Sequence, residues 1–233
     1  MKITNLLAIS LVLLCFSSCK NKLELKPIEK TDPLEFVKDS VSFMFDGKTY
    51  SDARFFSGYK GSNLLANIKV DSIVKTIYYY SSAKDSVMYT HTYGFDVEGP
   101  RIDITFLKKF NFNEMVKVTN WLPKDFNGFY KLGKRHYALD FGRDNSENGV
   151  AISINNGIIY KTFGSESFQK PPLLEQNSQV LSNFEIITFK KLGNDDYILE
   201  AKFNAKVFDE NKNSKDIQNG FLRLRLNLKN QKY

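Results

Sequence analysis

Alternation of apolar and polar residues is the dominant pattern of this chain from residue 41 onward. The longest run spans Val87–Val97, where every second residue is apolar, aromatic or histidine. Side chains two apart share one face of a strand, so this run predicts a half-buried β-strand. Similar alternation over Ile102–Phe106, Tyr197–Val207 and Leu222–Leu228 predicts further strands.

Turn residues separate these runs at short intervals. Asp46-Gly47 lies between two β-prone segments, and Val41–Tyr50 therefore predicts a hairpin. The Asn155–Gly157 turn predicts a second hairpin between Val150–Ile154 and Ile158–Phe163. We also expect strands over Leu64–Val70, Ile73–Tyr80, Gly128–Leu132, Tyr137–Phe141 and Phe184–Lys190, and a polar loop over Asp209–Asn219.

Helical periodicity is nearly missing, and Phe112–Asn120 is the one segment that could form a short helix. Many short strands with turns between them predict an all-β fold, specifically an antiparallel β-sandwich. A lipocalin-type β-barrel is the alternative. We expect residues 41–233 to form a single domain, since no linker divides them.

The N-terminus carries an export pattern. Lys2 precedes an apolar run of eleven residues, Leu6–Phe16, which is too short to span a bilayer. Ser17-Ser18-Cys19 follows and resembles a bacterial lipoprotein lipobox. The resemblance implies a signal peptide over residues 1–18, cleavage before Cys19, and attachment of lipid, including palmitate, to that cysteine.

Residues 19–40 predict a flexible tether between lipid and domain, because they are polar and contain Pro27 and Pro33. The expected location is the cell envelope, with the lipid held in the outer membrane. Surface-exported lipoproteins of the Bacteroidota often carry acidic residues directly after the lipidated cysteine, whereas Lys20–Lys22 follow here. The periplasmic face and the cell surface both remain open.

The charge and the cysteine content argue against several kinds of function. The formal charge is +7, but the basic residues are scattered along predicted strands, so we expect no nucleic-acid partner. The two cysteines are Cys15, in the signal peptide, and Cys19. The mature chain is therefore expected to contain neither a disulfide nor a free thiol.

Four short features occur together in this chain: Cys19, Phe43–Tyr50, Gly128–Leu132 and Asn219–Phe221. In these features the chain resembles a group of uncharacterised Bacteroidota lipoproteins with a β-sandwich domain. The resemblance implies fold and location but no activity. Asp-Ser-apolar triplets match the O-glycosylation acceptor of that phylum. The candidate acceptors are Ser40, Ser72 and Ser86.

Catalytic and metal signatures are weak. His91 lies on an apolar face and predicts a core histidine, whereas His136 predicts an exposed one. Asp209, Asn211 and Asn213 have the first spacings of a calcium loop, but the later positions do not fit, so a polar hairpin loop is favoured. We expect no cofactor and no metal. A carboxylate pair for glycoside hydrolysis cannot be tested from sequence.

The remaining candidates are aromatic. Tyr78, Tyr79 and Tyr80 cannot all face one core, because successive strand residues point to opposite faces. Together with Trp121 they are candidate ligand-binding residues for a glycan or a protein. The leading hypothesis is a non-catalytic envelope lipoprotein that acts as a binding or structural module. The alternatives are a polysaccharide hydrolase and a carrier of a small apolar ligand.

Overall fold

The computed structural model describes residues 37–52, 59–118, 120–126, 128–170, 174–192 and 196–228. These residues all belong to one compact unit, Pro33–Tyr233. The signal peptide, Cys19 and most of the expected tether lie outside the described residues. No helix within the described part is long and apolar enough to cross a membrane.

The described residues form fifteen β-strands and one short 3-10 turn, η3 (Phe112–Glu114). The strands of the first half are β1 (Ser40–Phe45), β2 (Lys48–Asp52), β3 (Tyr59–Leu65), β4 (Lys69–Val74), β5 (Ile77–Ser81), β6 (Ser86–Asp96), β7 (Arg101–Asn111) and β8 (Met115–Lys117). The strands of the second half are β9 (Trp121–Pro123), β10 (Gly133–Arg135), β11 (Gly149–Asn155), β12 (Ile159–Lys161), β13 (Asn183–Lys191), β14 (Asp196–Phe208) and β15 (Ser214–Asn227). The expectation of an all-β antiparallel fold is confirmed.

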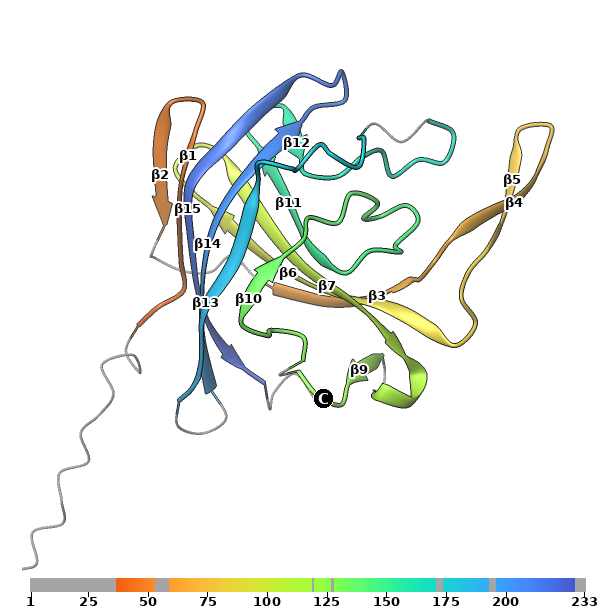
Figure 1. Cartoon of the computed structure of the whole chain (residues 1–233), viewed down its shortest axis with the longest axis horizontal. Helices are drawn as coiled ribbons and strands as arrows, with labels where there is room; N and C mark the ends of the chain where they lie inside the picture. Colours follow the sequence, from red (N-terminus) through yellow and green to blue (C-terminus); the bar gives the residue numbers. More distant parts are fainter. Residues whose placement is uncertain are drawn as a thin grey trace, which may run out of the picture. The chain divides into compact units, whose positions relative to one another are not determined.

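The strands form two layers of an antiparallel sandwich. One layer contains β2, β1, β15, β14, β13 and β10, and the other contains β12, β11, β7, β6 and β3. In Figure 1 the first group lies on the left, and β6 and β7 run across the domain toward a projecting hairpin on the right. The layers are joined where Lys161 on β12 pairs with Phe208 at the end of β14.

The continuous sheet path does not close. It ends at β2 on one side and at β3 on the other, and the described residues of these strands pair only with β1 and β6. The lipocalin-type barrel is therefore not formed.

The core lies between the layers and is rich in aromatic side chains. Phe106 on β7 meets Phe184 on β13 edge to face, with ring centroids 5.7 Å apart. Phe45 on β1 meets Tyr160 on β12 at the same centroid distance. These contacts join opposite layers, and such edge-to-face pairs add to the free energy of apolar burial. A smaller cluster around Met88 packs on the other face of β6.

Several predicted strands are confirmed at close to their expected bounds. The Val87–Val97 alternation is β6, and its predicted antiparallel partner is β7. The Val41–Tyr50 hairpin is β1–β2, with positive φ at Asp46 and Gly47, as tight hairpin turns require. The closing meander is β13–β14–β15.

Several predictions from sequence were wrong. The single strands expected over Leu64–Val70 and Ile73–Tyr80 are each interrupted, at residues 66–68 and 75–76, where Asn67 and Lys75 have positive φ, so these segments are divided among β3, β4 and β5. The segment Phe112–Asn120, the one place where a short helix was possible, contains a single 3-10 turn, η3, followed by β8. The expected strands Gly128–Leu132 and Tyr137–Phe141 do not form, since both segments are irregular and flank β10; only Tyr137 makes a single bridge, to Val150. The loop expected over Asp209–Asn219 is much shorter, because β15 already begins at Ser214.

Candidate functional site

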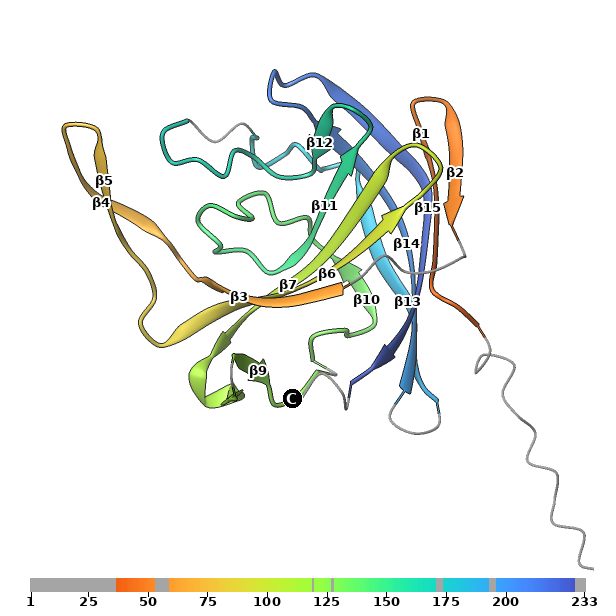
Figure 2. The ribbon, with the colours of Figure 1, turned by 180° about the vertical axis from the view of Figure 1, so that it is seen from behind.

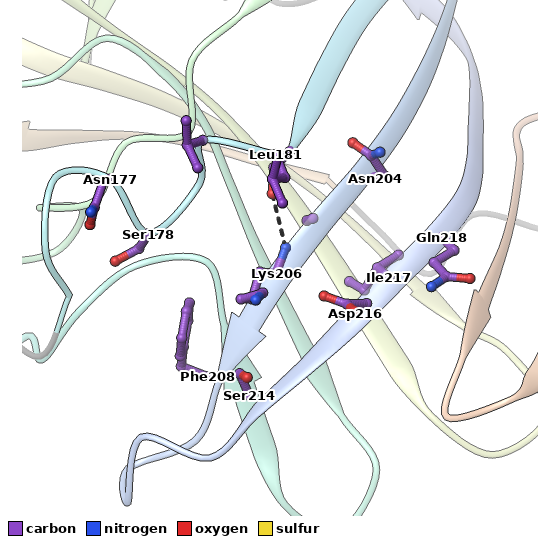
Figure 3. Close-up of a pocket in the computed structure, with 13 residues that line it drawn as sticks. Asn177, Ser178, Leu181, Asn204, Lys206, Phe208, Ser214, Asp216, Ile217 and Gln218 are labelled. Atoms are coloured by element: carbon purple, nitrogen blue, oxygen red, sulfur yellow. Dashed lines mark hydrogen bonds between the residues drawn. The ribbon is translucent and has the colours of Figure 1, made fainter.

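A groove of about 500 Å³ lies on strands β14 and β15 (Figure 3). Segment 177–182 forms one wall, and the outward-facing side chains of the two strands form the floor. The lining residues are Asn177, Ser178, Val180, Leu181, Ser182, Asn204, Ala205, Lys206, Phe208, Ser214, Asp216, Ile217 and Gln218.

The groove exists because β13 leaves β14 halfway along. Their pairing begins at Asn183 opposite Asn204, and beyond this point a side chain replaces the missing strand. Gln179 Nε2 donates to the Lys206 carbonyl at 2.6 Å, and Gln179 Oε1 accepts from the Lys206 backbone N–H at 3.3 Å. The Ser182 hydroxyl also accepts from that N–H at 3.1 Å, the dashed line in Figure 3. The Gln179 amide therefore pairs with β14 as a peptide group would.

The lining of the groove is mixed. Amides, hydroxyls, one carboxylate (Asp216) and one ammonium (Lys206) alternate with apolar groups, including Ala205, Phe208 and Ile217 on the two strands. The wall ends in Val180 and Leu181, whose side chains are 78% and 85% exposed. Amide and hydroxyl groups suit neutral polyhydroxyl or peptide ligands, and the exposed aliphatic pair offers an apolar contact at the rim.

The predicted tyrosines lie on β5, in a two-stranded sheet with β4. Tyr78 and Tyr80 share one face and stack, with ring centroids 6.3 Å apart, and Tyr80 also contacts Phe168 at 4.8 Å. Tyr79 lies on the opposite face and is exposed. The expectation that the three tyrosines use both strand faces is thus confirmed, and ligand binding by them stays a prediction.

Trp121 is not part of the same surface. It lies on β9, stacks on Phe112 with ring centroids 4.6 Å apart, and packs against the edge of the core. Figures 1 and 2 show β9 well separated from β5 in the plane of both views. The structure does not bring Trp121 and the tyrosines together into one aromatic platform.

The two histidines have the predicted environments. His91 is buried, and Tyr130 and Tyr93 hydroxyls lie 2.8 and 3.4 Å from its Nδ1. Burial lowers the pKa of His91 to about 3, because the charged imidazolium would lose its hydration. His136 is exposed. Within the described residues no three His, Cys, Asp or Glu side chains gather in a way that could hold a metal ion.

The Asp209 loop is a polar hairpin turn, as predicted. The Asp209 carboxylate accepts hydrogen bonds from the backbone N–H groups of Asn211 and Asn213, each at 2.8 Å. The Asn213 side chain donates a third at 2.9 Å. These bonds, led by the Asn213 side chain, lower the pKa of Asp209. The carboxylate oxygens are thus used to close the turn.

The candidate glycosylation sites differ in access. Ser72 on β4 is exposed, Ser40 at the start of β1 is half-buried, and Ser86 at the start of β6 is buried. A glycosyl transfer to the folded chain needs a reachable hydroxyl, so Ser72 is the best placed of the three. Modification itself stays a prediction.

Comparisons with known proteins give no match, whether the chain is scanned against protein-family models or searched against curated proteins and solved structures. The assignment of function therefore depends on the geometry of the chain itself. Sequence reasoning missed the groove, since its lining combines residues of β14, an irregular segment, and residues 214–218, which were expected to lie in a loop. The run Asn177–Ser182 carried no recognisable motif.

Proposed function

We propose that this chain is a non-catalytic, lipid-anchored envelope protein whose β domain binds a glycan in the groove on β14 and β15. The observation that carries the binding role is the groove itself. Its volume of about 500 Å³ falls within the usual range for ligand sites. Its amide and hydroxyl lining offers both donors and acceptors, which sugar hydroxyl groups need.

The anchor is supported by the sequence. An apolar run of eleven residues ending in Ser17-Ser18-Cys19 has the features of a lipoprotein signal. Lipid on Cys19 would place the domain at the outer membrane, at its periplasmic or outer surface. Replacement of Cys19 by Ala should shift the chain from the membrane fraction to the soluble fraction or leave its signal uncleaved.

A binding role fits the groove better than hydrolysis. Glycoside hydrolysis uses two carboxyl groups, about 5 to 9.5 Å apart. Asp216 is the one carboxylate among the described residues that line the groove. A carrier role is less well supported, because aromatic side chains such as Phe106 and Phe184 occupy the space between the layers.

The test is a glycan array followed by calorimetric titration of any hit. Replacement of Gln218 or Asp216 by Ala should weaken binding at least tenfold while the melting temperature stays unchanged, since both side chains are exposed. Thr76→Ala, at the tip of the β4–β5 hairpin, is the matched control and should bind as the wild type does. Equal binding by all variants would exclude the groove as the site.

Turnover provides the second arm of the test. Release of reducing ends from a bound glycan, abolished by Asp216→Asn, would overturn the non-catalytic assignment. Binding without turnover supports it. No hit on the array, combined with capture of an envelope protein that Gln218→Ala abolishes, would replace the glycan by a protein ligand in the same groove.

A further inference from the structure

The β4–β5 hairpin projects from the body of the domain as an arm (Figures 1 and 2). It prolongs the antiparallel ladder of β3 and β6, to which it is linked by a hydrogen bond from the Ala83 N–H to the Ala66 carbonyl. Its two strands form a separate sheet that pairs with no third strand in the described part of the chain. An isolated two-stranded hairpin is only marginally stable in water.

The base of the arm is nevertheless held in a fixed direction. The backbone N–H groups of Asn67 and Ile68 donate to the carbonyls of Asn145 and Asp144 at 3.3 and 2.8 Å. The Lys109 ammonium donates to the Asn67 side chain at 3.3 Å. These bonds anchor the arm to the segment that covers the outer face of β6 and β7.

The outer part of the arm exposes apolar side chains on both faces. Val74 pairs with Ile77 on one face, and Ile73 pairs with Tyr78 on the other. Ile73, Val74 and Ile77 are 55%, 52% and 57% exposed. A partner protein that docks against one face of a sheet would leave the other face in water. Apolar residues on both faces suit a medium that surrounds the tip.

The order of residues along the arm resembles that found at membrane interfaces. Val74 and Ile77 are the pair nearest the apex, Tyr78 lies at the level of Ile73, and Tyr79 and Tyr80 follow toward the base of the arm. Tyrosine is enriched at bilayer–water interfaces because its ring is apolar and its hydroxyl is polar. Lys69 and Lys75 give the hairpin a positive charge, while its one carboxylate, Asp71, accepts a hydrogen bond from the Ser81 hydroxyl.

We propose that the tip of the β4–β5 arm inserts into the interfacial layer of an anionic phospholipid bilayer. The charge of the arm and the formal charge of +7 on the chain complement anionic headgroups. Insertion is shallow, because the Lys75 ammonium at the apex has to remain at the level of the phosphates while its methylene stem lies among apolar groups. The contact is independent of the groove and of glycan binding.

The test uses the full chain with Cys15→Ser and Cys19→Ser, so that a single introduced cysteine carries an environment-sensitive fluorophore. Ile77→Cys places the probe at the tip. Ile158→Cys is the matched control, because the two isoleucines are 57% and 54% exposed and Ile158 lies in a turn of the body. Probe emission is the readout, since the apolar run Leu6–Phe16 could itself bring the chain to vesicles.

With vesicles containing phosphatidylglycerol, the probe at residue 77 should shift to the blue and be quenched by lipids spin-labelled near the headgroup. The probe at residue 158 should show neither change. In the Ile77→Cys chain, Lys75→Glu reverses one charge and should raise the lipid concentration needed for half of the shift by at least fivefold, the factor for one basic residue. Pure phosphatidylcholine vesicles should give a weaker shift.

Three results would overturn the proposal. The first is an unshifted probe at residue 77 on anionic vesicles. The second is an equal shift at residues 77 and 158. The third is a blue shift at residue 77 without vesicles that grows with protein concentration, which would indicate that a second copy of the chain covers the arm.

Discussion

His91 makes the stability of the domain depend on pH in a way that can be calculated. The imidazole is 1% exposed, and burial lowers its pKa from 6.5 to about 3. In the unfolded chain the imidazole is hydrated and titrates near ~6.5. Between these two pKa values the unfolded state binds a proton that the folded state does not bind. The free energy of unfolding therefore falls as the pH falls through this window.

The size of the loss follows from the two pKa values. Each pH unit inside the window corresponds to about 1.4 kcal/mol, so acidification from pH 7 to pH 4 should lower the free energy of unfolding by about 3 kcal/mol through His91 alone. Domains are typically stable by only ~5–15 kcal/mol. The expected loss is therefore a large fraction of the total stability.

The assay is urea unfolding at pH 7 and pH 4, followed by the fluorescence of Trp121, the one tryptophan. His91→Phe should be less stable at pH 7, because it leaves the Tyr130 hydroxyl without the ring nitrogen at 2.8 Å. On acidification, however, it should lose about 3 kcal/mol less than the wild type. His136→Gln is the control and should follow the wild type, since His136 is exposed.

Carboxylates titrate in the same pH range, but they do so in every variant, so the comparison isolates the histidine. If the wild type and His91→Phe lose equal stability between pH 7 and pH 4, the reasoning fails. A direct titration of the His91 ring by NMR that gave a pKa near the ordinary value would refute it equally.

Two further perturbations test the packing of β14. Gly220→Ala places a Cβ 2.5 to 2.6 Å from ring atoms of Phe203 on the neighbouring strand, which should cost about 1–3 kcal/mol in urea unfolding. Phe203→Leu in the same chain should relieve part of the cost, and simple addition of the two losses would contradict the steric explanation. Gln179→Ala should speed hydrogen exchange of the Lys206 N–H and cost about 1 kcal/mol, because it removes two bonds to the backbone of β14. The exposed Gln176→Ala should leave that exchange rate unchanged.

The sequence predicted those strands in which one face is apolar and the other polar. The Val87–Val97 run became β6, whose odd-numbered residues face the core between the layers, although Met88 and Thr90 on its other face are buried as well. The same pattern identified β14, whose buried residues alternate from Leu199 to Val207. In such strands a shift of one residue would move every apolar side chain out of the core, so the sequence pattern and the observed pairing agree.

Prediction from the sequence failed where the local pattern and the tertiary pairing disagree. The first half of β15 contains one buried aliphatic residue, Ile217, and the pairing shifts between Phe203 and Ala205 opposite it. Asn219 has a positive φ at the same place, which breaks the alternation. The strand forms there because β14 supplies a partner, and a partner distant in sequence leaves no periodic signal.

The groove could not be predicted for a related reason. Part of its floor comes from β14, whose residues read as ordinary strand positions. The rest comes from residues 214–218, which lie within the loop expected over Asp209–Asn219. The groove forms because β13 begins only at Asn183, opposite Asn204. The rest of β14 is bordered by the Gln179 side chain instead of a strand. A side chain that replaces a backbone group is set by tertiary geometry, not by a local motif.

Glycosylation of Ser72 and insertion of the β4–β5 arm into a bilayer exclude each other. It pairs with Tyr79 on the exposed arm, next to Ile73, and it is the most accessible of the candidate glycosylation sites. A glycan at this position would add polar bulk beside the aliphatic tip and would keep it out of a bilayer. Contact of the arm with lipid therefore requires an unmodified Ser72, and the mass of the tryptic peptide from the native chain distinguishes the two.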